Sequence, residues 1–171
     1  MVSSERLSWL AGLWDGEGSI CLFNAKSQYN NKPKIVPAII VTNCDSNIIN
    51  EVLKIVDDLG TSLFVFEREG NEKHKASFQL TSRSFSNVKI ILTAISPYLI
   101  GKKSQAEMVL RYINKRQRLA EEQGKKNYLG FDNDDWEMLS EVKRLNRRGP
   151  EPSETKDLTA SADDIVQPTT Q

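Results

Sequence analysis

The sequence has few of the residues that build disulfide scaffolds, zinc sites or nucleophilic hydrolases. Its 171 residues include two cysteines, Cys21 and Cys44, and one histidine, His74. Two cysteines are too few for a disulfide framework, and adding one histidine does not give a conventional zinc set. A Ser-His-Asp or Cys-His hydrolase is excluded unless His74 carries all of the chemistry.

Long apolar stretches are also missing. No run approaches the roughly 18 apolar residues that a membrane span needs. The amino-terminal MVSSERLSWLAG lacks the basic flank and the uninterrupted apolar stretch of a secretory signal. These features are consistent with an intracellular protein that is organelle-encoded, prokaryotic or phage, but the sequence leaves the localisation and the host open. Apolar residues at 39% and charged residues at 27% suit one globular domain with at most a tail.

Acidic residues are scarce in two stretches of the sequence, residues 18–44 and 102–126. Residues 150–171 hold five acids and one base, which leaves 22 basic and 18 acidic residues, a net charge of +4, in a domain over 1–149. We expect residues 150–171 to form a disordered acidic tail. Between residues 18 and 44 there are three lysines and no acid, and between 102 and 126 eight basic residues against three acidic. Two basic stretches suit a polyanionic partner, although ordinary solvated faces would show the same charges.

Apolar spacing and turn residues predict a helix, then a hairpin and a helix twice over, then further helices. The predicted helices cover residues 4–15, 45–59, 84–95 and 102–119, with a short one from about 132–135 to 143–148. The predicted strands cover 19–29, 34–43, 61–68 and 75–82. Four antiparallel strands with helices on one face leave the other face open to a partner.

The most informative stretch is LAGLWDGEGSI, residues 10–20. Gly12 and Gly16 lie four apart in the first predicted helix, so they give it a face without side chains on which a second helix can pack closely. Glu17 ends that helix, and two close copies would bring two carboxylates together, an arrangement that suits a divalent cation. Alternatively, Asp15 and Glu17 only belong to a glycine-rich turn.

This stretch resembles the signature of the LAGLIDADG homing endonucleases in its Leu-Ala-Gly opening, its central acid and its terminal acid-glycine pair. The predicted αββαββα order is also that of the family, and the resemblance covers about residues 4–120. It implies an α+β fold, a four-stranded antiparallel DNA-binding saddle with helices on one face. One copy of the motif implies a homodimer. Its implied interface lies on the motif helix and includes Leu10, Gly12, Leu13 and Gly16.

The resemblance also implies the roles of individual residues. Glu17 and the carbonyl of Gly16 would bind metal, and Lys102, a better match than Lys103, would support the scissile phosphate. Asn43 would orient catalytic water, although a strand-end asparagine equally suits a turn cap. The expected cofactor is Mg²⁺, with Mn²⁺ as a substitute and Ca²⁺ binding without supporting cleavage. The implied reaction is double-strand cleavage of a DNA site of about 20 base pairs.

Strand alternation predicts which side chains face the DNA. With the parity set from Ser19, they are Ser19, Cys21, Phe23, Ala25, Ser27, Lys34, Val36, Ala38, Ile40, Thr42, Arg68, Lys75, Ser77, Gln79, Thr81 and Arg83. A bulge at Pro37 would instead turn Lys26, Ile35 and Ile39 toward the DNA. The predicted phosphate contacts are Lys103, Lys115, Arg116, Arg118, Lys143, Arg147 and Arg148.

Two other functions use the same scaffold: an RNA maturase that assists intron splicing, and a non-catalytic DNA-binding regulator. The presence of Glu17 and Lys102 favours cleavage, because a protein that only binds nucleic acid does not need them. Site-specific DNA cleavage by a homing endonuclease is therefore the function that the resemblance and these residues favour, and the sequence leaves open whether an intron encodes the chain.

Overall fold

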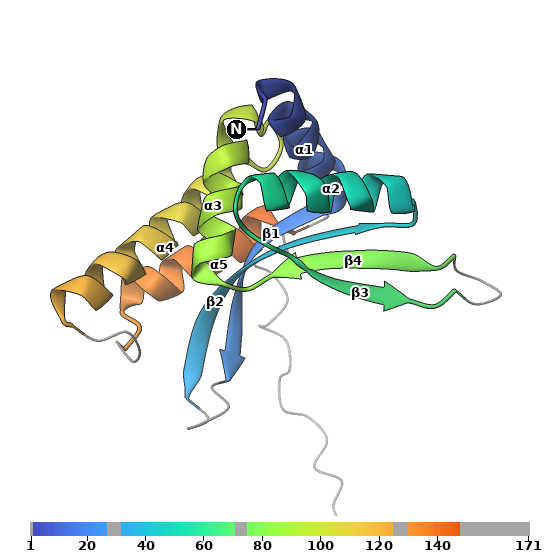
Figure 1. Ribbon diagram of the computed structural model, residues 1–171. Helices are drawn as coiled ribbons and strands as arrows, with labels where there is room; N and C mark the ends of the chain where they lie inside the picture. The colour runs from blue at the N-terminus through green and yellow to red at the C-terminus, as the bar shows by residue number, and fades with distance from the viewer. Residues whose placement is uncertain (1, 27–31, 71–74, 125–129, 148–171) are drawn as a thin grey trace, which may run out of the picture.

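The computed structural model describes residues 2–26, 32–70, 75–124 and 130–147 (Figure 1). Its elements follow the predicted order and form an α+β domain. They are α1 (Ser4–Glu17), β1 (Gly18–Lys26), β2 (Pro33–Asn43), α2 (Ser46–Asp58), β3 (Phe64–Arg68), β4 (Ser77–Ser82), α3 (Phe85–Ile95), the 3₁₀ turn η1 (Ser96–Tyr98), α4 (Lys103–Glu122) and α5 (Asn133–Leu145). None of the helices in these described segments is long and apolar enough to cross a membrane.

The four strands form one antiparallel sheet in the order β1-β2-β4-β3. The pairing of β1 with β2 runs without a bulge from Gly18 opposite Val41 to Lys26 opposite Pro33, and Pro37 sits in register opposite Leu22. Ile35 and Ile39 are consequently buried on the helical face. The parity predicted from Ser19 is confirmed, and the alternative set with Ile35 and Ile39 outward is wrong.

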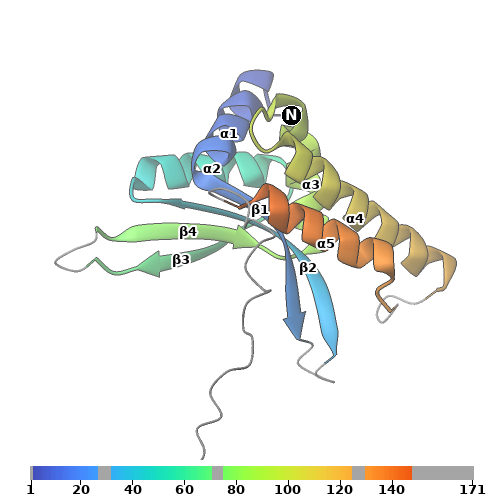
Figure 2. The ribbon, with the colours of Figure 1, turned by 180° about the vertical axis from the view of Figure 1, so that it is seen from behind.

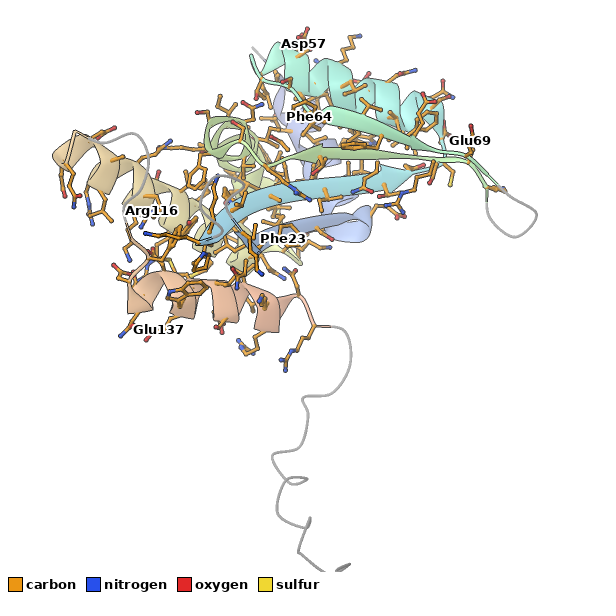
Figure 3. All side chains as sticks on the ribbon, turned by 90° about the horizontal axis from the view of Figure 1, so that it is seen from below. Phe23, Asp57, Phe64, Glu69, Arg116 and Glu137 are labelled. Atoms are coloured by element: carbon orange, nitrogen blue, oxygen red, sulfur yellow. The ribbon has the colours of Figure 1, made fainter. Side chains whose placement is uncertain are left out.

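The helices gather on one face of the sheet, and the opposite face has no helix over it (Figures 1 and 3). Apolar side chains from every helix meet the inward row of the strands. Trp14 of α1, Val52 of α2 and Ile91 of α3 are all fully buried in this core, together with Ile20 of β1 and Leu80 of β4. The other sheet face is the open face of the molecule.

Helix α1 runs to Glu17, two residues beyond its predicted end. Gly18 ends it with an extended backbone (φ −89°, ψ 171°), and its amide still donates to the carbonyl of Trp14. A Cβ atom at Gly18 would lie 2.5 Å from Cδ1 of Trp14, so a side chain there would collide with the core. This close approach fixes Glu17 at the point where the helix meets the first strand.

Helix α5 lies against α4 and beside the start of β1 (Figure 2). At its carboxyl end Asn146 donates to the carbonyl of Ile20 at 2.8 Å, and the carbonyl of Leu145 accepts from Nε2 of Gln105 at 3.2 Å. The final helix is confirmed and spans residues 133–145. The predicted tail over 150–171, and with it Ser27 and Arg148 of the predicted interface, lies outside the described residues.

Candidate active site and nucleic-acid interface

Glu17 is the last residue of α1, and its side chain is exposed. Gly16 before it is also exposed and lies in the last helical turn, where backbone carbonyls lack partners within the helix. Within the described residues no three His, Cys, Asp or Glu side chains come together as a metal-binding group. The end of α1 therefore offers one free carboxylate and the nearby carbonyl of Gly16, oxygen donors of the kind that suit a hard cation.

Asp15 is engaged elsewhere and is not a free ligand. Its carboxylate accepts from the backbone amides of Ile100 at 2.7 Å and Lys102 at 2.8 Å. Partial burial raises the pKa of Asp15, but the hydrogen bonds from the amides of residues 100–102 outweigh it, so the pKa lies below its usual value. The central acid of the motif thus fastens the loop before α4 to the end of α1.

Lys102 is brought to the end of α1 by the same contacts. Its ammonium group donates to the backbone carbonyl of Asp15, two residues before Glu17. Lys103, one position on, is the first residue of α4 and is exposed. The structure therefore brings Lys102, and not Lys103, next to the carboxyl end of the motif helix.

Asn43 ends β2, and its side chain caps the turn before α2. Its Oδ1 accepts from the backbone amide of Asp45 at 2.8 Å, and Asp45 in turn accepts from the amide of Asn47. The structure therefore shows the side-chain oxygen of Asn43 as a turn cap, which is the alternative that the sequence left open. The Nδ2 group and the second lone pair of Oδ1 remain available for contact with water.

The outward side of α1 is not covered by other described residues of the chain at Gly12 and Gly16. A Cβ atom at Gly12 or Gly16 would meet nothing within 4 Å, and Trp9 beside them is 41% exposed. Leu10, predicted at the dimer interface, is fully buried in the core of its own chain, and that prediction is corrected. The face at Gly12 and Gly16 was predicted from their spacing, but Trp9, three residues before Gly12, was missed. Also missed was Ile100, which is 91% exposed on the loop that Asp15 holds.

The open face carries the predicted strand residues in rows set by the register. Ser19, Ile40, Thr81 and Phe64 form one row, and Thr42, Gln79 and Phe66 the next. Phe64 and Phe66 are 68% and 55% exposed. They were missed, although they share the parity of Arg68, which was predicted. Ala38 is fully buried despite its outward register, so its predicted DNA contact is corrected.

Basic side chains on this face are partly oriented by their neighbours. Arg68 donates from Nη2 to Oε1 of Gln79 at 2.6 Å. The guanidinium of Arg83 lies 5.8 Å from the ring centroid of Phe23, the aromatic residue of β1 (Figure 3). Lys34 and Lys75 are exposed. Such side chains can contact phosphate while the strands between them face base edges.

Two of the predicted phosphate contacts serve the fold instead. Lys115 and Arg116 have side chains only 15% and 12% exposed and pair with Asp135, which is fully buried, at 3.2 and 3.0 Å. Their predicted contact with DNA is corrected, because both side chains of α4 are largely buried in ion pairs with Asp135 of α5. Lys143 and Arg147 are exposed, and Arg118 is exposed with Glu122 3.8 Å away.

Solved structures of homing endonucleases are similar to this chain. The homing endonuclease I-CvuI in complex with its target has 20% sequence identity and a TM-score of 0.58, with 86% of each chain covered. The LAGLIDADG homing endonuclease I-GzeII in complex with its DNA target has 19% identity and a TM-score of 0.54, over 81% of this chain and 43% of that one. The archaeal intron-encoded I-Vdi141I complexed with DNA has 16% identity and a TM-score of 0.51, over 82% and 96%.

No protein-family model and no curated protein matches the chain. The structural likeness establishes the fold, which is the four-stranded saddle of the LAGLIDADG homing endonucleases. The fold implied by the motif LAGLWDGEG is therefore confirmed.

Proposed function

We propose that this chain is a LAGLIDADG homing endonuclease that cuts both strands of a specific DNA site as a homodimer. The observation that carries the proposal is the position of Glu17. Its carboxylate is exposed at the end of a helix with a bare glycine face, and Lys102 is held beside that end by Asp15. The carboxylate of Glu17 and the ammonium group of Lys102 thus both lie at the carboxyl end of α1, next to the start of β1.

Assembly as a dimer is supported by two independent features. The outward face of α1 at Gly12 and Gly16 leaves room for a second backbone. The chain covers 86% of I-CvuI but only 43% of I-GzeII, so one copy matches about half of the longer protein. Packing two α1 helices along this face would bring two copies of Glu17 together, so that both chains contribute ligands to the metal-binding site.

In the dimer, Glu17 and the carbonyl of Gly16 from each chain would hold divalent cations, Mg²⁺ or its substitute Mn²⁺. When bound, such an ion neutralises charge on the phosphate and on the leaving 3′ oxygen. Lys102 adds a positive charge beside the same phosphate. The nucleophile in this proposal is water, to which Asn43 can offer its Nδ2 group.

The open face would lie in the major groove, where the base pairs can be distinguished. The 11 residues of β2 span about 36 Å. This length matches about one turn of duplex, so two saddles would cover on the order of 20 base pairs. A binding site of that size is long enough to be rare in a genome.

A random-site DNA library incubated with the protein tests this function. We expect the recovery of cut ends from a narrow set of sequences with Mg²⁺, and intact DNA when EDTA is added. DNA that is bound but never cut would favour the regulator. Tight binding of structured intron RNA without DNA cleavage would favour the maturase.

A further inference from the structure

Two phenylalanines on β3 stand out among the strand residues. Phe64 and Phe66 expose 68% and 55% of their surface, more than Phe23, which exposes 36%. Aromatic rings gain stability from burial, and neighbouring exposed ones mark a surface that contacts something else. Nothing within the described part of the chain covers these two.

Both rings belong to the open face. Phe64 pairs in register with Thr81, and Phe66 with Gln79, whereas Val65 between them pairs with Leu80 of the core. The same rows continue to Ile40 and Thr42 on β2. Thr81 and Gln79 of β4 separate the two rings from β2, so Phe64 and Phe66 form an aromatic pair at the β3 edge of the open face, where Figure 3 shows Phe64.

The charges around Phe64 and Phe66 indicate the chemistry of the partner that contacts the two rings. Arg68 follows on the same strand and face and is held by Gln79 at 2.6 Å, and Lys34 is exposed on β2. Among the described strand residues of the open face there is no acidic side chain. A partner that fits must be anionic and must also offer apolar groups at the height of the rings.

The major groove of DNA meets both conditions. Its walls are phosphates, and the apolar group on its base edges is the 5-methyl of thymine, which phenylalanine contacts favourably. A ring placed against the amino group of cytosine or the O6 and N7 of guanine would instead remove a polar edge from water without a hydrogen bond in return. The rings thus discriminate in favour of thymine.

We propose that Phe64 and Phe66 read thymine methyl groups, so that the target site carries thymines opposite β3. The inference rests on the proposed DNA-binding function and names part of its substrate. Phe64 shares its row with Ser19 at the start of β1, whereas Phe23 and Ala25 lie further from the motif helix. The thymines therefore belong to the part of each half-site nearer the centre.

Replacement of thymine by uracil tests this directly, because uracil pairs identically but lacks the methyl group. Sites are first selected from a random library, and binding is measured in Ca²⁺ with each thymine of the half-site replaced in turn. Loss of one buried methyl should weaken binding about fourfold. We expect this loss at one or two inner positions, and we expect 5-methylcytosine to bind better than cytosine there.

Variants then assign the effect to the rings. Phe64→Ser and Phe66→Ser should each bind thymine and uracil equally at one of those positions. Val65→Ser, on the same strand but the opposite face, is the matched control and should keep the parental discrimination.

Two results would overturn this inference and leave the proposed function standing. One is that the parent binds the selected sites equally well with thymine and with uracil. The other is that each serine variant loses the same binding affinity for the thymine site as for the uracil site. A chain that binds no DNA in the library overturns this inference together with the proposed function.

Discussion

At the scale of single residues, the two acids of the motif have different surroundings although they stand two positions apart. Glu17 is exposed at the helix end, while Asp15 accepts two amides from the loop before α4. The position of Glu17 at the end of the first helix was predictable from the motif. The partners of Asp15 lie 85 and 87 residues away along the chain, so no local pattern could reveal them. The exposure of Ile100 could not be predicted either, because it depends on the same contact between distant parts of the chain.

Asp15 acts on the site through Lys102, and a double substitution tests this. An amide in Asp15→Asn can accept only one of the two backbone amides, so the loop shifts and cleavage should fall about 10- to 100-fold. In a Lys102→Gln background the same substitution should cost little more. Cleavage rates of the four proteins give the coupling, and equal losses in both backgrounds would show that Asp15 only supports the fold.

Acid should weaken the fold through the same carboxylate. The pKa of Asp15 is lowered in the folded chain, so its contribution to stability is present above its unfolded pKa of about 3.8 and is lost as the pH falls through the lower folded value. Denaturant unfolding from about pH 6 down to about pH 2 measures this. The decline below about pH 4 should be shallower in Asp15→Asn, and an identical decline would contradict the assignment.

At the scale of elements, α5 depends on charges that the sequence reading assigned to DNA. Lys115 and Arg116 looked like part of a basic stretch, but α4 and α5 fold back so that both meet Asp135. Alternation along β2 was predictable because Ile35, Ile39 and Val41 are two or four residues apart and all buried. Pairing between α4 and α5 was not, because it depends on how two separate helices dock.

Removing the buried charge at Asp135 should loosen α5. Asp135→Asn leaves Lys115 and Arg116 without their buried partner and should lower the free energy of unfolding by about 3 kcal/mol. Asp134→Asn is the matched control; its side chain is 41% exposed, so we expect a loss below about 1 kcal/mol. Chemical denaturation measures both, and equal losses would contradict a central role for Asp135.

At the scale of the whole molecule, the account requires two copies. Each chain presents one Glu17, one saddle and one α1 face, and the described residues of a single chain hold no complete metal-binding group. Under the proposed function, the unit that reads about 20 base pairs and cuts both strands is a symmetric pair of these chains.

Substitution of Gly12 tests the assembly. A Cβ atom there would have no neighbour within 4 Å in its own chain, so Gly12→Leu should fold yet hold two α1 helices apart. Light scattering should report a dimer for the parent and a monomer for Gly12→Leu, with Gly12→Ala between them. Ser140→Leu, at an exposed position of α5, is the control for added bulk. A monomeric parent that still cleaves would contradict the dimer.

The central claim is that Glu17 holds the metal for cleavage, and Glu17→Gln tests it most directly. The amide keeps the size of the side chain and loses the charge that binds a divalent ion. Nicking assays in Mg²⁺ and gel-shift titrations in Ca²⁺ should show cleavage lowered by orders of magnitude, with DNA binding retained because it depends on many contacts elsewhere. Cleavage by the variant close to that of the parent would contradict the account.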